Sequence, residues 1–181
     1  MARLTPITSK DQADPKDHAV VDAITASRGV LGGPLSLFMY CPEMAGRVSH
    51  LGAYVRFEAE IDQRVRTLAA MTVAREFDAV YVWGAQSAGA RSLGVPESTI
   101  DAVRAKHANG VPAEDAAIIE FTQQLVRNHR VSDAAIAAMR QRFGDKGLIE
   151  LTGTIGYYTM LAMTVNACEL EAGEGAEVLK P

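Results

Sequence analysis

The sequence predicts an all-α fold, a single domain built as a bundle of about seven to eight helices. Hydrophobic residues make up 48% of the 181 residues but aromatic residues only 6%, and alanine is frequent throughout. This composition favours packed helices over sheets. Apolar residues recur at helical spacing, and no segment alternates apolar and polar residues over the length of a strand. We therefore expect one domain over residues 1–181.

Start and stop signals define the predicted helices. An acidic residue or a proline in the first turn begins a helix, and a glycine after the last apolar residue ends it. The predicted helices cover 14–29, 42–58, 62–77, 78–94, 96–107, 113–130, 132–143 and 146–170, with a short helical piece over 35–40 between the first two. Residues 1–13 precede them as an extended arm, and residues 171–181 follow as a polar tail.

The first four helices have the clearest boundaries. Asp14 and Pro15 open the first helix, and Gly29 ends it. The loop 32–34 separates this helix from the short helix over 35–40. Pro42 begins the longer third helix, and Asp62 caps the fourth.

The later helices are bounded in the same way. Asp78 caps the fifth helix, which Gly94 ends, and the loop 109–112 precedes the seventh. Each half of the chain closes on a long helix rich in small residues, over 78–93 and 146–170, so the bundle could be a duplicated helical unit.

One segment, residues 148–167, has about the length of a membrane span. It contains Glu150, Asn166, four threonines and two tyrosines, which the hydrocarbon core of a membrane penalises. We expect a helix buried in a soluble bundle or oligomer, and no membrane partner.

Charge and cysteine content exclude several classes of function. The net charge of −4 comes without a basic cluster, so we expect no nucleic-acid partner. The N-terminus lacks the apolar segment of a signal peptide, which predicts a cytoplasmic protein. Cys41 and Cys168 are far apart and form no Cys-x-x-Cys motif, so both are expected to be ordinary buried thiols. The histidines have no metal-ligand spacing, and we expect no metal or other cofactor.

The segment 78–94, DAVYVWGAQSAGARSLG, carries a Tyr-Val-Trp-x-x-Gln block over residues 81–86. It resembles the signature helix of the carboxymuconolactone decarboxylase and alkylhydroperoxidase-D-like family, which has Tyr-Glu-Trp-x-x-His or Cys-x-x-Cys-x-x-x-His there. Further motifs in the family's order are Gly-Pro at 33–34, Cys-Pro-Glu-Met at 41–44, LGAYVRF at 51–57, GYY at 156–158 and MTVN at 163–166. The resemblance covers residues 34–170 and implies an alkylhydroperoxidase-D-like bundle that assembles as a homo-oligomer, a trimer or hexamer.

The residues on which the family's chemistry relies are missing. Its peroxidases use a glutamate, two cysteines and a histidine, and the resemblance places these at Thr67, Ala79, Val82 and Gln86. A thiol peroxidase needs an attacking thiolate and a resolving thiol. The family's decarboxylases use histidine and glutamate as acid and base, whereas an amide such as Gln86 moves no proton at neutral pH.

The helix over 78–93 still presents a candidate pocket face. Val82 and Gln86 are four residues apart and share a face with Ala79 and Ala90. This face either lines an apolar pocket with one amide to orient a ligand, or has become part of the core. Two neighbours on the same helix are further candidates, Tyr81 as a catalytic residue and Trp83 as a substrate-binding residue. Thr67, on the preceding helix, is also a candidate for substrate binding.

A second group of candidates lies on the predicted third helix. His50, Tyr54 and Glu58 are spaced i, i+4, i+8 and either supply a histidine–carboxylate acid–base pair near the pocket or form a solvated or subunit-facing stripe. Arg56 either holds a substrate carboxylate or bonds a neighbouring helix end. The tyrosines at 157–158 either pack with satisfied hydroxyls or line the pocket.

These observations support three functions. The first is a cofactor-free lyase, decarboxylase or hydratase that acts on a small lactone or unsaturated acid, with acid–base groups drawn from His50, Tyr54, Glu58, Tyr81 and Gln86. The second is a non-catalytic protein that binds a small ligand or acts as a scaffold. The third, which the missing cysteines disfavour, is alkylhydroperoxidase-like activity.

Overall fold

The computed structural model describes residues 2–173, 175–177 and 179, and helices are the only regular elements in these ranges. The α-helices are α1 (His18–Arg28), α2 (Pro34–Phe38), α3 (Pro42–Ala53), α4 (Gln63–Glu76), α5 (Val80–Ser92), α6 (Glu97–Arg104), α7 (Ala113–Asn128) and α8 (Asp133–Ala167). Two short 3-10 turns, η1 (Lys10–Gln12) and η2 (Pro15–Asp17), and one π-helical turn, η3 (Tyr54–Glu58), complete the fold. The all-α prediction is confirmed.

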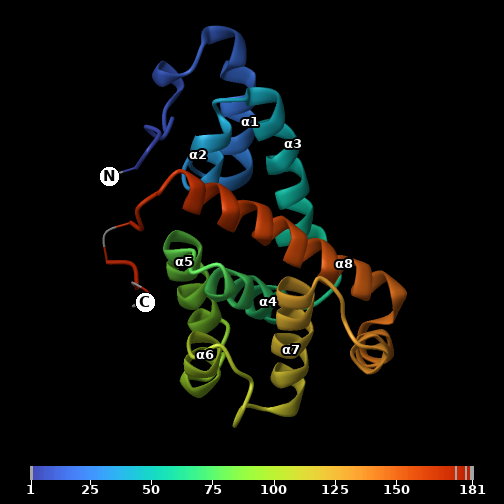
Figure 1. Cartoon of the computed structure of the whole chain (residues 1–181). Coiled ribbons are helices and arrows are strands. Elements are labelled where there is room, and N and C mark those ends of the chain that lie inside the picture. The colour runs from blue at the N-terminus through green and yellow to red at the C-terminus, as the bar shows by residue number, and fades with distance from the viewer. Residues whose placement is uncertain (1, 174, 178, 180–181) are drawn as a thin grey trace.

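Helix α8 crosses the middle of the molecule, with α1, α2 and α3 on one side and α4 to α7 on the other (Figure 1). Helix α4 packs against α5, α7 and α8. Its side chains at Leu68 and Met71 are fully buried, as are Trp83 on α5, Ile118 on α7 and Leu151 on α8. The central position of α4 explains why residues 68–74 in its middle are completely buried on every side.

Helix α8 is broken where the sequence predicts a boundary between two helices. Gly144 has φ 67° and ψ −177°, a conformation outside the helical region that a glycine adopts without strain. The segment before the break is capped by Ser132, the first residue of the predicted range, whose hydroxyl accepts from the amide of Ala135. The segment after it ends at Ala167, before the predicted end at residue 170. No helix in the described ranges combines the length and the apolar character needed to cross a membrane.

The predicted third helix changes character before it ends. The α-helical winding stops at Ala53, and the amide of Ala59 donates to the carbonyl of Tyr54 at 2.9 Å, a π-type turn. Because this turn is wider than an α-helical one, Glu58 falls out of the i, i+4, i+8 register that its spacing from His50 and Tyr54 predicted.

Glu150 of α8 secures this π-helical turn. Its carboxylate accepts from the Tyr54 hydroxyl at 2.6 Å and from the amides of Glu60 and Ile61 at 2.9 and 3.0 Å. Burial alone would raise the pKa of Glu150, but these hydrogen bonds outweigh burial and lower it. The buried carboxylate therefore fixes the path of the chain between α3 and α4.

The start of α5 differs from the prediction. The helix begins at Val80 with Ala79 as its N-cap, and Asp78 makes no capping bond. Asp78 instead adopts a left-handed conformation with φ 48°, and its carboxylate pairs with Arg75 and Lys106. Ion pairing with neighbouring elements has replaced the predicted cap.

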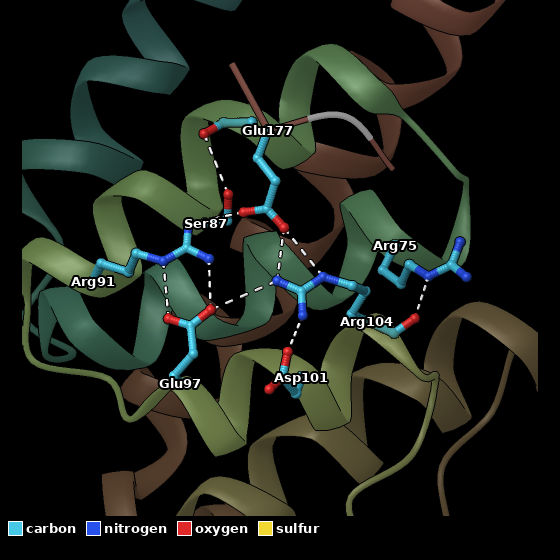
Figure 2. A network of polar contacts seen from close by, with 8 residues as sticks. Arg75, Ser87, Arg91, Glu97, Asp101, Arg104 and Glu177 are labelled. Carbon is cyan, nitrogen blue, oxygen red and sulfur yellow. Dashed lines mark hydrogen bonds and ion pairs between the residues drawn. The ribbon is translucent and has the colours of Figure 1, made fainter. Parts of the chain in front are cut away.

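Both terminal segments lie against the bundle. In the N-terminal arm, the amide of Arg3 donates to the carbonyl of Cys168 and the amide of Ile7 to that of Ser36. The described part of the predicted polar tail folds back onto α5 and α6, where Glu177 lies between Arg91 and Arg104 (Figure 2). Its carboxylate accepts from these two side chains at 2.8 and 2.6 Å.

Acidification should release the Glu177 contact. Burial alone would raise the pKa of Glu177, but the hydrogen bonds from Arg91 and Arg104 lower it to about 2 from the usual 4.5. A lowered folded-state pKa adds stability above pH 4.5 that is lost as the pH falls toward 2. Between pH 6 and pH 3, the wild type should therefore lose about 1 kcal/mol more unfolding free energy than Glu177→Gln, a small value because the pair is partly exposed.

Urea unfolding at both pH values measures this difference. Glu120→Gln is the matched control, because Glu120 is exposed and forms no ion pair with the described residues. Equal losses in the wild type and in Glu177→Gln would contradict the stabilising role of the tail contact.

Candidate functional site

A cavity of about 270 Å³ lies between the α1–α2 loop, η3, α5 and α8. Its apolar lining comes from Val30, Leu35, Val82 and Leu161. Its polar lining consists of Arg28, Arg56, Tyr81, Gln86, Tyr157 and Tyr158. An apolar enclosure with a few convergent polar groups is the usual form of a small-molecule site.

Two glycines allow the polar side chains to approach the cavity wall. Gly33 has φ 57°, and a Cβ there would lie 2.7 Å from the Tyr81 hydroxyl. A Cβ at Gly52 would collide with the Tyr157 hydroxyl and a terminal nitrogen of Arg28. Glycine at position 52 therefore lets Tyr157 and Arg28 meet over α3.

The three tyrosines are neutral hydrogen-bond donors at physiological pH. Burial raises the pKa of Tyr81, Tyr157 and Tyr158, and although Arg28 and Arg56 oppose the rise for Tyr157 and Tyr158, both pKa values stay above 10.0. The rings of Tyr157 and Tyr158 meet edge to face, with centroids 5.4 Å apart. Gln86 donates its amide to the Tyr158 hydroxyl at 3.4 Å, which leaves the hydroxyl proton free for another acceptor.

Neither arginine of this cavity has a carboxylate partner among the described residues. Arg28 donates to the carbonyl of Ser49 at 3.3 Å, and its Nε is buried without a partner. The Arg56 guanidinium stacks over the Phe57 ring at 5.3 Å and makes no hydrogen bond within the described part of the chain. Arg56 therefore does not bond a helix end, which was one of its two predicted roles.

A smaller cavity of about 140 Å³ adjoins the first. The two share Arg56, Ala85, Gln86 and Tyr158. The smaller cavity adds Arg66, whose side chain donates to the carbonyl of Val55 at 2.7 Å while its Nε is buried without a partner. It also adds Gln63, Thr67 and Ser92.

The predicted face of α5 does line a cavity, although its register differs. Val82 and Gln86 border the larger cavity. Ala79 and Ala90 are completely buried in the core, and Ala85 and Gly89 take their places at the cavity walls. Of the four residues of the predicted face, Val82 and Gln86 therefore border the cavity, and Ala79 and Ala90 belong to the core.

The other candidates divide between the cavities and the remainder of the molecule. Tyr81 and Arg56 line the larger cavity, and Thr67 lines the smaller. Trp83 lines neither: it is completely buried under the Arg104 guanidinium, which lies 5.5 Å from its ring centroid. Its predicted contact with substrate is therefore corrected to a place in the core.

His50, Tyr54 and Glu58 are exposed and line neither of these two cavities. Tyr54 faces a separate groove, where it bonds Glu150. The exposure of these side chains fits the second of their two predicted arrangements, a solvated or subunit-facing stripe, and not an acid–base pair near the pocket. Cys41 also differs from its prediction, since its side chain is exposed.

Sequence reasoning missed Arg28 and Arg66. Arg28 has no acidic residue three or four positions away, a weak signal that its partner lies elsewhere. Arg66 follows Asp62 by four residues and looks paired in the sequence. In the structure, however, the Asp62 carboxylate accepts from the amide of Arg64 as a helix cap. Only the fold shows that Arg66 has no carboxylate partner among the described residues.

No group of three or more metal-ligating side chains occurs among the described residues. The two cysteines line neither of the adjoining cavities. The chemistry available at this site is thus that of guanidinium, phenol and amide groups.

No protein-family model matches the chain, and no curated protein matches it. Several solved structures are similar to it. One is an alkylhydroperoxidase AhpD core, an uncharacterised peroxidase-related protein from Ralstonia eutropha. It aligns with a TM-score of 0.77 at 12% identity, over 96% of this chain and 93% of its own.

Two further structures agree. A peroxidase-related protein from a Silicibacter species aligns with a TM-score of 0.74 at 14% identity, over 99% of this chain and 96% of its own. A protein of unknown function from Agrobacterium tumefaciens gives 0.67 at 15% identity, over 75% and 94%. These likenesses confirm the alkylhydroperoxidase-D-like resemblance at the level of the fold: the chain has the fold of the alkylhydroperoxidase AhpD core.

Proposed function

We propose that this protein binds a small organic acid, such as an unsaturated acid or a carboxylated lactone, in the larger cavity and acts on it as a cofactor-free lyase of the decarboxylase type. The observation that carries the proposal is the meeting of two arginines without carboxylate partners and three neutral tyrosine hydroxyls in one cavity. Guanidinium groups bind carboxylates through paired hydrogen bonds. Phenol hydroxyls donate to oxygens on which negative charge develops.

Decarboxylation suits a site without a base, because the substrate carboxylate itself starts the reaction. The bond between carbon and the departing carboxylate breaks, carbon dioxide leaves, and the electron pair passes to an adjacent carbonyl, which becomes an enolate. The Tyr158 hydroxyl donates to the enolate oxygen and stabilises its charge. Tyr158 then gives its proton to the carbon and regains one from water.

In this scheme Gln86 is a positioning residue. Its amide donates to the Tyr158 oxygen, so the hydroxyl proton points away from Gln86 and remains available to the substrate. An amide with no titration of its own is suited to this task, which accounts for glutamine at the position where the family has histidine.

The pH profile tests the proton donor. Because burial keeps the pKa of Tyr158 above 10.0, its proton is present through neutral pH and is lost only above that value. The rate should therefore be flat from about pH 6 to pH 9 and fall at higher pH. Tyr158→Phe should abolish turnover while substrate affinity stays within about threefold, a small change because Arg28 and Arg56 still hold the carboxylate.

A decarboxylation assay by release of carbon dioxide, combined with calorimetric binding, measures both quantities. A bell-shaped profile whose acid limb is lost in His50→Ala would contradict this assignment and support His50 as a catalytic base. Binding without turnover of any tested acid would instead indicate a non-catalytic binding protein.

Thiol peroxidase activity, which the descriptions of the structural neighbours suggest, is not what this site supports. Ala79 and Val82 stand where the family's peroxidases have cysteines, and neither Cys41 nor Cys168 reaches the cavities. No thiolate is available there to attack a peroxide bond.

We further propose that the protein is a homo-oligomer, a trimer or hexamer. Large apolar side chains on α3, η3 and α8 are exposed in the single chain, among them Leu51, Phe57, Ile149 and Met163. Exposed apolar surface of this kind supports burial between subunits. The molecular mass in solution decides the stoichiometry.

A further inference from the structure

One face of α8 is exposed and carries no charge between residues 149 and 163. Ile149 and Met163 are the two exposed large apolar residues of this helix, at 69% and 55%. Glu150, the one charged residue of this stretch, is buried and bonds the π-helical turn η3. A helix face that stays in water normally carries charged side chains. The other exposed positions of the stretch are likewise uncharged: Thr152, Gly153 and Gly156.

Gly156 lies midway between Ile149 and Met163, seven residues from each. Residues seven apart lie almost above one another on a helix, so the three share one line along α8. A Cβ at Gly156 would meet no described atom within 4 Å, although alanine is more stable than glycine inside a helix. Packing within the single chain therefore gives no reason for a glycine here, whereas close approach by a second backbone does.

An apolar groove beside Ile149 offers the complementary shape. If a second α8 crosses antiparallel, about a two-fold axis at Gly156, its Met163 falls next to Ile149 and beside this groove. A methionine side chain is unbranched and flexible, so it fills irregular apolar spaces well. The two-fold axis repeats the contact, so each copy supplies one methionine and one groove. The groove lies between α3, η3 and α8, and among its lining residues are Leu51, Tyr54, Ile149 and Gly153.

The area of the contact extends beyond α8. Residues 149–163 span about 21 Å of a helix about 10 Å wide, so two such faces bury about 400 Å² in total. A stable complex buries about 1,200 Å² or more. The far wall of the groove widens the surface, because Leu51 and Tyr54 are also exposed there. The ion pair of Lys146 with Glu60 beside the groove forms a polar rim.

We propose that a second copy of this chain docks on this face, with the two α8 helices antiparallel about a two-fold axis through Gly156. Each Ile149 then contacts the partner subunit's Met163. This inference rests on the proposed homo-oligomer and specifies how its subunits meet. It favours the hexamer, because a hexamer of two paired trimers contains two-fold axes and a single trimer does not.

Exchange of charges across the contact tests the proposal. Ile149→Glu or Met163→Lys alone places two unpaired charges in each contact, so each should raise the dissociation constant at least about 30-fold. The combined Ile149→Glu/Met163→Lys variant should recover most of this loss, because each glutamate then meets a lysine of the partner subunit. Within one chain the two positions are about 21 Å apart along α8, too far to pair. Sedimentation velocity over a range of protein concentrations measures the association.

Ala23→Glu is the matched control, because Ala23 is exposed on α1 and does not line the groove. It should associate like the wild type. Circular dichroism should show every variant folded, since Ile149 and Met163 are exposed in the single chain. Unchanged association in both single variants would overturn the α8 contact. Loss in both without recovery in the combined variant would overturn the antiparallel pairing.

Gly156→Cys, made with Cys41→Ser and Cys168→Ser, gives a second measurement. The two-fold axis brings the two cysteines together, and a disulfide requires Cα atoms about 4.4–6.8 Å apart. Mild oxidation should link most of this variant into covalent dimers. Thr152→Cys in the same background should link far less, because the axis separates its two copies by about 12 Å along the helices.

The outcomes distinguish this contact from the oligomer on which it rests. A wild type that is monomeric at every concentration would overturn both the proposed homo-oligomer and the α8 pairing. An oligomeric wild type in which Gly156→Cys links no better than Thr152→Cys would overturn the α8 pairing alone.

Discussion

Replacing Arg56 by glutamine should weaken the binding of a small carboxylate about 10- to 30-fold, or about 1.5–2 kcal/mol, the range for a charged hydrogen-bonded contact that keeps some exposure to water. Arg56 borders both cavities and has no hydrogen bond or ion pair with other described residues. Its guanidinium is therefore available to a ligand. Isothermal titration calorimetry with a monoacid that the wild type binds provides the measurement.

Two control variants and a melting temperature distinguish a direct contact between Arg56 and the carboxylate from a loss of protein stability and from the loss of one positive charge. Arg56→Lys keeps the charge but loses the planar fork of donors, so its affinity should lie between those of the wild type and Arg56→Gln. Arg130→Gln should bind like the wild type, because Arg130 is exposed and lines neither cavity. Because Arg56 forms no structural bond, its variants should melt within about 2 °C of the wild type. Unchanged affinity in Arg56→Gln would remove Arg56 from the site.

Replacing Trp83 by alanine should lower the free energy of unfolding by about 3–5 kcal/mol, the usual cost of removing a large aromatic side chain from a core. Trp83 is completely buried, and Arg104 lies over its ring at 5.5 Å. For a domain of this size such a loss lowers the melting temperature by about 10 °C or more. Chemical and thermal unfolding followed by circular dichroism measure it.

Trp83→Phe distinguishes a core residue from a ligand contact. A phenylalanine keeps most of the buried apolar surface, so this variant should lose less stability than Trp83→Ala and, while folded, should bind the acid with wild-type affinity. The reverse pattern, with stability retained and affinity reduced, would return Trp83 to the binding site that the sequence predicted.

Helix positions were largely predictable because their signals are local. Pro42, Asp62 and Ser132 mark helix starts that the structure confirms, and Gly144 breaks α8 between the two predicted helices. The exceptions have tertiary causes. Asp78 pairs with Arg75 and Lys106 instead of capping α5, and a carboxylate from α8 holds the π-helical turn that ends α3.

The site was predictable only where its residues share one helix. Val82 and Gln86 lie four residues apart on α5, so helical spacing was enough to place them on one face, and the structure finds them at one cavity. The i, i+4, i+8 spacing left His50 and Glu58 either near the pocket or on an exposed stripe, and only the structure shows that both are exposed and lie outside the two cavities. Trp83 was misplaced because proximity to the motif says nothing about which way a side chain faces.

The sequence alone predicts an all-helical protein that resembles the alkylhydroperoxidase-D-like family. It also shows that other residues occupy the positions of that family's titrating groups. These features depend only on the identity and order of the residues. Only the tertiary structure shows that Arg28, Arg56 and Arg66 line two adjoining cavities, both of which Tyr158 borders. These residues belong to four separate elements, so no local pattern relates them. Their meeting depends on how α1, η3, α4 and α8 pack, and that packing is set by the burial of the apolar faces of these elements.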